Sequence, residues 1–291
     1  MTRATGIAVA FGIAAAGANL AGAFAVTKSA RFGLKFIEVM VAFAAGFMLA
    51  LALVAALPEA LARRPTEGAI AALVGYLLVH LTQHTFTQHF HFGVETHSVS
   101  HVASRSALIG LLLHTFFDGV AIASGFIVSN SLGLLFFCAI FLHKLPEGVT
   151  ISSLAMASGE GPRRAVLWAA YLGGATVLGV LLTEQLGLLT EYGLAVSAGV
   201  TLYVGASNLV PEFQGKKGWR LPLAFFAGAA AFVGADLLLA LEREVTDPAE
   251  HPLLKLGGIA EDRGPDLSYD PAVEHGRALA DALLPRRGRG A

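Results

Sequence analysis

The feature of this sequence that most constrains its fold is a series of long apolar stretches separated by short polar ones. Eight windows are long enough to cross a bilayer, near residues 5–27, 36–61, 67–91, 104–128, 132–158, 164–187, 191–212 and 220–242. A membrane-spanning helix needs about 20 predominantly apolar residues, and the strict polar–apolar alternation of barrel strands is absent. The sequence therefore predicts an all-α polytopic membrane protein with eight transmembrane helices.

The overall composition excludes several other classes of protein. Only 14% of the 291 residues are charged, and the mean hydropathy is +0.65. A soluble domain usually carries about 25% charged residues, so an ordinary soluble enzyme, a disordered chain and a nucleic-acid binder are all excluded. The single cysteine, Cys138, also excludes a disulfide framework and a cysteine-based zinc fold.

Lysine and arginine in the short loops predict how the chain is oriented, because cytoplasmic loops carry an excess of these residues. The loops after the first, third, fifth and seventh windows hold Lys28, Arg31, Lys35, Arg105, Arg163, Arg164, Lys216, Lys217 and Arg220. The loops after the other windows hold only Arg63 and Arg64. We therefore expect the first group of loops in the cytoplasm and both termini to be non-cytoplasmic.

The windows define one domain, residues 1–242, followed by a stretch of different composition. Residues 243–291 are rich in Pro, Gly, Asp, Glu and Arg and contain no window long enough to cross a membrane. This composition predicts a polar, mostly disordered tail. The first window lacks a signal-peptidase type of cleavage site, so we expect it to be retained as a span. No internal repeat is strong enough to predict.

Two windows contain ionisable residues in similar motifs. His114 precedes Asp118, and His143 precedes Glu147, by four residues. An ionisable group within a span costs several kcal/mol, about 2.5–3.5 on insertion scales, and is therefore a candidate functional residue. Residues i and i+4 share one helix face, so two such helices would supply two nitrogen and two oxygen ligands. This set suits Zn²⁺ and also Fe²⁺ or Mn²⁺.

Neighbouring residues favour a metal site at these motifs. Pro146 frees a helical carbonyl beside His143 that water, a neighbour or a passing ion can contact. Gly119 and Gly148 follow the two carboxylates and would allow neighbouring helices to approach closely. The alternative is that the His–carboxylate pairs are interhelical hydrogen bonds that only stabilise the bundle.

At these residues the chain resembles the ZIP (Zrt/Irt-like protein) family of divalent-metal transporters. Members typically show H-N-x-x-D-G and H-E-x-P-E-G, and this sequence has HTFFDG from His114 and HKLPEG from His143. Further similar segments are residues 43–50 with 57–60, and residues 202–204 with 209–212. The resemblance covers about residues 5–242 and does not include the tail.

The resemblance implies a secondary transporter that moves Zn²⁺ or a similar divalent cation (Fe²⁺, Mn²⁺ or Cd²⁺) toward the cytoplasm. Its transport-site ligands would be His114, Asp118, His143 and Glu147. It also implies a homodimer in the lipid bilayer and elevator-like movement. In that movement the windows 5–27, 104–128, 132–158 and 164–187 would slide against the windows 36–61, 67–91, 191–212 and 220–242.

The sequence departs from the family pattern at a second metal position. In bacterial members a second metal can be held by the residue after each motif histidine and by a Glu from the sixth helix. Those positions here are Thr115, Lys144 and, by a looser alignment, Thr176. Hydroxyl groups are weak ligands and a lysine ammonium is not a ligand, so we expect one metal at the centre. Lys144 would then pair with the carboxylates, or alternatively extend toward an interface.

Histidines are concentrated at the end of the third window. His80, His84, His89, His91, His97 and His101 are six of the ten in the chain. His80, His84 and His91 lie on one helical stripe, and the predicted orientation puts the end of this run in the cytoplasm. They are candidates for a metal relay or a sensor of cytoplasmic metal. The alternative is a solvated histidine cluster at the membrane interface.

Two other functions remain open from the sequence alone. An intramembrane zinc hydrolase would use His114, Asp118 and His143 as ligands and Glu147 as base, although no H-E-x-x-H motif is present. A metal-responsive membrane regulator with little flux would use the histidine run and the tail. We favour a transporter over an enzyme, with the cation as substrate, no prosthetic group and no nucleic-acid partner. The short loops suggest a bacterial inner membrane.

Overall fold

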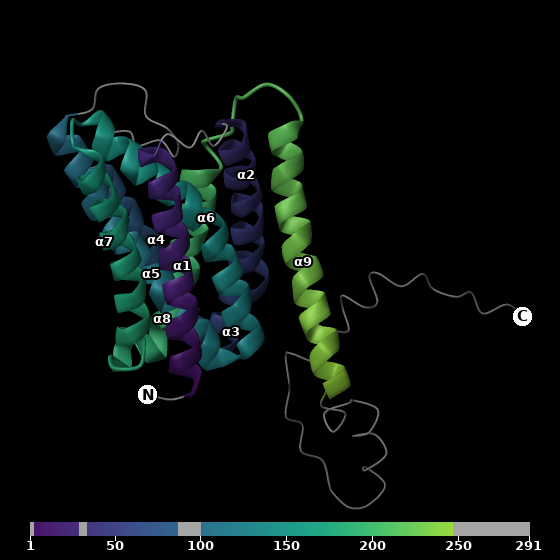
Figure 1. Ribbon diagram of the computed structural model, residues 1–291. Coiled ribbons are helices and arrows are strands. Elements are labelled where there is room, and N and C mark those ends of the chain that lie inside the picture. Colours follow the sequence, from purple (N-terminus) through teal and green to yellow (C-terminus); the bar gives the residue numbers. More distant parts are fainter. Residues whose placement is uncertain (1–2, 29–33, 87–99, 247–291) are drawn as a thin grey trace, which may run out of the picture. The chain divides into compact units, whose positions relative to one another are not determined.

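The computed structural model describes residues 3–28, 34–86 and 100–246, which contain α-helices and two π-helical segments but no strand (Figure 1). The α-helices are α1 (Arg3–Thr27), α2 (Leu34–Ala50), α3 (Leu57–Arg63), α4 (Pro65–Phe86), α5 (His101–Val128), α6 (Asn130–Ala157), α7 (Pro162–Thr183), α8 (Gly187–Tyr203) and α9 (Arg220–Thr246). The π-helical segments are η1 (Leu51–Ala56) and η2 (Val204–Leu209). The predicted all-helical fold class is confirmed.

Eight helical stretches are long and apolar enough to cross a membrane, as predicted. They are Thr5–Thr27, Lys35–Arg63, Pro65–Thr82, Ser104–Val128, Asn130–Ala157, Pro162–Thr183, Gly187–Leu209 and Arg220–Leu241. Their ends differ from the expected windows by a few residues, except that the third window extends beyond α4 into residues outside those described. The sides of the membrane on which the termini lie stay predictions.

The chain separates into two units, Met1–Ala240 and Leu241–Ala291. The first contains nearly all of the residues that form the spans. Of the second, only residues 241–246 are described, and they complete α9. The expected disorder of the tail therefore concerns residues that lie almost entirely outside those described, and it stays a prediction.

Four pairs of helices in the described part of the chain cross where one glycine of each helix meets the backbone of the other. A Cβ atom on any of these glycines would overlap a carbonyl oxygen of the partner helix, so the two backbones are in direct contact. The glycines are Gly22 and Gly148 for α1 and α6, Gly119 and Gly179 for α5 and α7, Gly75 and Gly199 for α4 and α8, and Gly46 and Gly228 for α2 and α9. The expected close approach at Gly119 and Gly148 is confirmed.

The crossings give four pairs of spans, and the other helix contacts allow these pairs to be grouped into two sets. The α1 set consists of α1, α5, α6 and α7, which all contact one another. The α2 set consists of α2, α3, α4, α8 and α9. Between the sets, the three atoms nearest to a Cβ on Gly193 of α8 are side-chain atoms of Val120 and Ser124 of α5. Among the described residues, backbone-to-backbone glycine crossings occur within each set and not between the sets.

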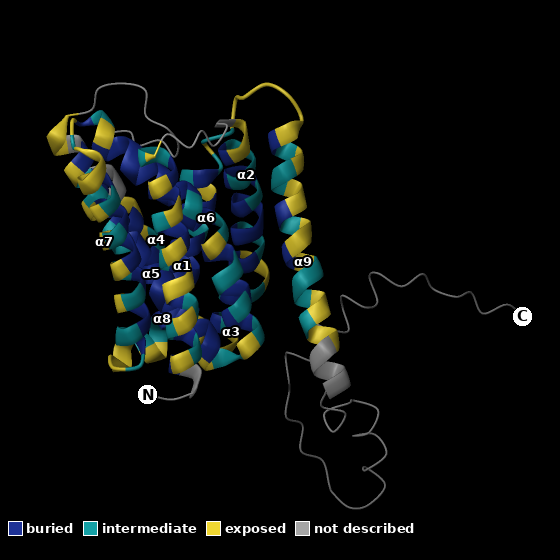
Figure 2. Cartoon of the chain, in the orientation of Figure 1, coloured by how far each residue is buried: buried dark blue, intermediate teal, exposed yellow. Residues whose placement is uncertain are grey.

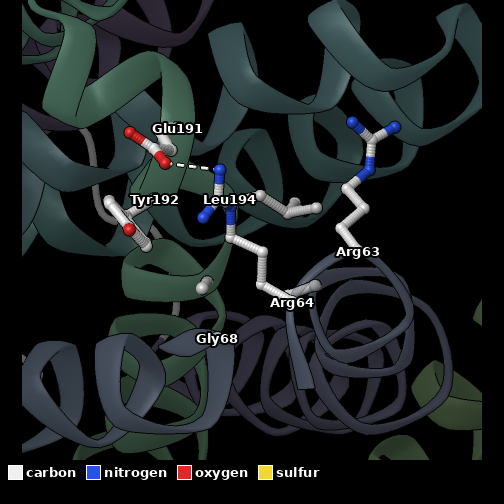
Figure 3. A pocket seen from close by; sticks show the side chains of 8 residues that line it. Arg63, Arg64, Gly68, Glu191, Tyr192 and Leu194 are labelled. Atoms are coloured by element: carbon white, nitrogen blue, oxygen red, sulfur yellow. Dashed lines mark ion pairs between the residues drawn. The ribbon is translucent and has the colours of Figure 1, made fainter. Parts of the chain in front are cut away.

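An ion pair and a cation–π contact join the turn between α3 and α4 to α8, within the α2 set. Arg64 Nη2 lies 2.5 Å from Glu191 Oε1, and its guanidinium lies 5.4 Å from the centre of the Tyr192 ring. These side chains and their neighbours line a small pocket (Figure 3). Arg63 also lines this pocket and pairs with Glu59 of its own helix at 2.8 Å. The pocket lining includes none of the predicted metal ligands, so we assign it a role in packing.

Spans two and seven contain the same irregularity at the same place in a repeated pattern. Gly46 precedes Pro58 by the same number of residues as Gly199 precedes Pro211, and a π-helical segment lies between them in both spans. The residue before each proline donates its N–H to the carbonyl five residues earlier. Successive spans run in opposite directions, so these two π turns lie toward opposite faces of the membrane. The two spans thus share a local Gly-to-Pro pattern around a π turn.

The glycine crossings predict a sharp difference between two alanine substitutions in the same helix. Gly22→Ala should destabilise the protein by about 1–3 kcal/mol, because the added methyl group overlaps the backbone of α6. Gly17→Ala is the matched control, since its Cβ would have no atom within 4 Å. Thermal unfolding of the purified variants in detergent measures both effects. Equal melting temperatures for the two variants would contradict the proposed tight crossing.

Candidate metal centre

The four predicted ligands lie near the middle of α5 and α6. His114 and Asp118 are one turn apart on α5, and His143 and Glu147 are one turn apart on α6. Helix α6 continues through Pro146, which neighbouring helices in a membrane protein commonly permit. These two helices are the most buried of the spans: 72% of the apolar window of α5 and 67% of that of α6 are buried, compared with 11% for α9 (Figure 2). The fold thus brings all four side chains into the interior.

The four side chains converge on one point. Each offers one ligand atom, and these atoms lie within 4.8 Å of one another. The Nε2 atoms of His114 and His143 are both 3.4 Å from Asp118 Oδ2, and they are 4.0 and 3.9 Å from Glu147 Oε2. Ligands bound to a tetrahedral Zn²⁺ lie about 3.3–3.6 Å apart. A contraction on the order of 1 Å at the widest pair of ligand atoms would therefore complete a two-nitrogen, two-oxygen shell.

The hydrogen bonds of the two imidazoles leave nitrogen atoms available to a cation. His143 Nδ1 lies 3.0 Å from the Ala139 carbonyl oxygen, and its Nε2 lies 3.4 Å from Asp118 Oδ2. When the neutral ring donates through Nδ1, the shorter contact, the Nε2 lone pair faces the carboxylates. Neither ring nitrogen of His114 has a hydrogen-bond partner among the described residues, although both are buried. Buried polar atoms are normally paired. Nitrogen lone pairs directed at carboxylate oxygens favour a cation between them.

Lys144 lies inside this cluster and does not extend toward an interface. Its side chain has no solvent exposure, and Nζ is 2.7 Å from Asp118 Oδ2 and 2.8 Å from Glu147 Oε2. The ammonium group therefore donates to one oxygen of each carboxylate. The alternative in which Lys144 reaches toward the membrane interface is wrong for this structure.

Comparison with known proteins supports the family suggested by the motifs. The family model for ZIP zinc transporters matches residues 93–242, just over half of the chain, a range that includes all four ligands. The chain belongs to the ZIP family. Zinc transporter ZIP9-A of Xenopus laevis is 28% identical over 159 residues, which cover 50% of this chain and 52% of that protein.

Two human ZIP proteins are also similar. Zinc transporter ZIP5 is 31% identical over 158 residues, covering 51% of this chain and 29% of ZIP5. Zinc transporter ZIP6 is 32% identical over 111 residues, covering 36% of this chain and 14% of ZIP6. The chain thus spans about half of its ZIP9 relatives and much less of ZIP5 and ZIP6. These animal relatives give no support to the expected bacterial inner membrane.

A sixth polar group of this ZIP protein, Asn19 of α1, contacts the cluster and is not among the predicted ligands. Asn19 Nδ2 donates to Glu147 Oε1 at 3.3 Å, and its backbone packs against Gly148. The hydrogen bond fixes the carboxylate oxygen that does not face the histidines. The only signal in the sequence is a lone amide within an apolar window, and such a residue is equally typical of an interhelical hydrogen bond.

The other two positions of the second metal site in ZIP relatives do not point polar groups into the cluster. The Thr115 hydroxyl donates to the Leu112 carbonyl at 3.1 Å, and the Thr176 hydroxyl donates to the Leu172 carbonyl at 3.3 Å. Both hydroxyls are thus satisfied within their own helices. Since neither position offers a carboxylate, the expectation of one metal at the centre stays a prediction with geometric support.

Of the candidate relay histidines, only His80 has a described side chain, and it is not part of the metal cluster. His80 lies on an exposed face of α4, and its ring centre is 5.7 Å from that of Tyr203. The side chain of His84 and the whole of His91 lie outside the described residues. The relay hypothesis for these three therefore stays a prediction.

His101, at the end of the histidine run, begins α5 near the turn between α6 and α7. Its Nδ1 lies 4.0 Å from Glu160 Oε1, which is also 3.9 Å from Arg105 Nη2. Arg164 Nη1 donates to Glu160 Oε2 at 2.7 Å, and this bond holds the pKa of the Glu160 carboxyl below its usual value. The ion pairs of Glu160 thus join the start of α5, the turn after α6 and the start of α7.

The cluster geometry predicts which histidines are required for metal binding. His114→Ala should weaken Zn²⁺ binding on the order of 100-fold or more, because one of four ligands is lost and even outer-shell partners are worth 10–100-fold. His80→Ala is the matched histidine control and should leave the affinity unchanged. Calorimetric titration of the purified protein with Zn²⁺ measures both affinities, with thermal unfolding as a check on folding. Loss of Zn²⁺ binding in the His80 variant would mean that the metal site has been assigned to the wrong helices.

Proposed function

We propose that this protein is a secondary transporter that moves Zn²⁺, or a similar divalent cation such as Fe²⁺, Mn²⁺ or Cd²⁺, across a membrane toward the cytoplasm. The observation that carries the proposal is the convergence of His114, Asp118, His143 and Glu147 at the middle of two buried, membrane-length helices. The family relationship supports it, since the ZIP5, ZIP6 and ZIP9 relatives are all named zinc transporters. The cation is a substrate, and no prosthetic group is required.

The ligand set suits reversible binding of a hydrated divalent ion. An ion entering the protein loses its water, and carboxylate oxygens and imidazole nitrogens replace that shell. Buried carboxylates need a compensating charge, which the ion supplies. Because the ligands lie far from both ends of their helices, the ion must be exposed to each side in turn, as in alternating-access carriers.

The division of the spans into two sets supports an elevator-like movement. The charged cluster and the groups that contact it belong to α1, α5 and α6, which are all in the α1 set. At the boundary, the Ser197 hydroxyl of α8 donates to the Phe117 carbonyl of α5 at 3.4 Å, a long hydrogen bond. Side-chain contacts of this kind resist sliding less than interlocked backbones do. We propose that the α1 set moves against the α2 set and carries the ion.

We also propose an orientation of the chain in the membrane and a homodimeric assembly. Positive-inside counting supports cytoplasmic loops after the odd-numbered spans and non-cytoplasmic termini. The family resemblance supports a homodimer, which the mass of the protein in a native membrane nanodisc would test. The chain is an integral membrane protein; the named relatives do not support the bacterial inner membrane, so the compartment is not part of the proposal.

The hydrolase hypothesis is less consistent with the site. A zinc hydrolase needs an open coordination position and a free base. Glu147, the expected base, is held by Asn19 on one oxygen and by Lys144 on the other. We therefore propose transport and not catalysis. Metal uptake by protein in liposomes, compared with turnover of lipid substrates, separates the two.

The transport proposal predicts that single ligand changes abolish uptake. His143→Ala and Glu147→Ala should each abolish or severely reduce Zn²⁺ uptake into proteoliposomes, because three remaining ligands leave the buried ion incompletely coordinated. Glu38→Gln is a suitable control, since Glu38 pairs with Lys216 outside the site. Folding is checked by thermal unfolding. Uptake at the wild-type rate in either ligand variant would remove that residue from the pathway.

Deletion of the C-terminal residues distinguishes the transporter hypothesis from the regulator hypothesis. Truncation after Thr246 removes residues 247–291 and retains all of α9. If the α1 and α2 sets suffice for transport, the truncated protein should take up Zn²⁺ within about twofold of the full chain, because the ligands and their supporting helices remain. Complete loss of uptake in a folded truncated protein would favour a regulatory role that depends on the tail.

A further inference from the structure

We propose that Lys144 is a tethered counter-ion that takes the place of the transported cation between transport events. Its ammonium group bridges Asp118 and Glu147 when no metal is bound and moves aside when a metal arrives. The carrier would then return without metal and without a co-transported ion, and it would carry one divalent cation per cycle. This inference rests on the proposed transport function.

The ammonium and the proposed metal use the same oxygen atoms. Lys144 Nζ is 2.7 Å from Asp118 Oδ2 and 2.8 Å from Glu147 Oε2. Both histidine Nε2 atoms face these same two oxygens, at 3.4 Å from the first and 3.9–4.0 Å from the second. A cation coordinated by the four ligands would therefore lie a few ångströms from Nζ and repel it. The lysine side chain has a flexible four-carbon stem, which allows Nζ to move while the helix stays in place.

The formal charges of the cluster explain why such an exchange works. Asp118, Glu147 and Lys144 together carry a charge of minus one, and a bound divalent cation changes it to plus one. The cluster thus has the same magnitude of charge with and without metal, and neither form requires a further ion. A second divalent cation would raise the charge to plus three, which a low-dielectric interior disfavours.

The burial of Lys144 is difficult to explain by structure alone. Among the described residues it is the only Lys or Arg that is buried. Burying charged groups costs more than burying apolar residues of similar volume, and replacing an ion-pair cluster by apolar residues often leaves stability unchanged or higher. A cluster needed only for packing would not require these charges. A site that releases a divalent cation and then crosses the membrane without it does require a positive charge.

The inference is tested by comparing two kinds of flux in the same proteoliposomes. Zinc exchange, with equal Zn²⁺ on both sides and a radioactive tracer outside, never requires the carrier to cross without metal. Net uptake into metal-free vesicles does require it. The vesicles contain N-methylglucamine as the monovalent cation, and external thiocyanate balances the charge. Wild-type protein should show both fluxes.

Lys144→Met removes the tethered charge and keeps a side chain of similar length. In this variant the ratio of net uptake to exchange should fall at least tenfold, and the affinity for Zn²⁺ should rise about tenfold because the competing ammonium is lost. Lys216→Met is the matched control, since Lys216 pairs with Glu38 outside the site, and its ratio should stay within twofold of wild type. An unchanged ratio in Lys144→Met would overturn the inference.

A measurement on wild-type protein covers the case in which Lys144→Met does not fold. The membrane potential that stops net zinc flux at a known gradient gives the charge moved per zinc ion, and this charge should be two. A different value would mean that another ion moves with the metal and would overturn the inference. Absence of both exchange and net uptake in wild-type protein would instead overturn the proposed transport function.

Discussion

The burial of two carboxylates, two imidazoles and an ammonium group between apolar helices is the constraint on which the rest of this structure depends. A charge within a membrane span is costly, so each charged group must be paired. The Lys144 ammonium bridges Asp118 and Glu147, and Asn19 donates a hydrogen bond to the other carboxylate oxygen of Glu147. These short contacts require α1, α5 and α6 to approach closely. The glycine crossings make that approach possible.

The packing also determines which parts of the protein can move together. The groups that neutralise or orient the charges come from α1, α5 and α6, and Gly119 fixes α7 to α5. Separating these helices would expose unpaired charges, whereas sliding all four together would not. The side-chain boundary with the α2 set is the less costly place for movement. The same packing of α1, α5, α6 and α7 therefore pairs the buried charges and determines which helices can move as one unit.

The fold and the four candidate ligands that the structure brings together could be predicted because each leaves a local signal in the sequence. Spans appear as apolar windows, and the ligands appear as ionisable residues four apart within such windows. For Lys144 the sequence left two positions open, since a long side chain next to His143 can turn inward or toward an interface. Asn19 lies far from its partner Glu147 in the sequence. The contact between them depends on how α1 packs against α6, and no local pattern records that packing.

The π turns of spans two and seven have a consequence for how these spans are compared between sequences. A π turn holds one more residue than an α turn, and one residue corresponds to about 100° of rotation around a helix. Before η1, α2 contacts α6; after it, α3 contacts α4 and α8. The π turn thus rotates the second half of the span relative to the first, so that the two halves contact different neighbouring helices. A one-residue gap between aligned sequences at Leu51–Ala56 or Val204–Leu209 would therefore mark a change of helical phase and not a difference in loop length.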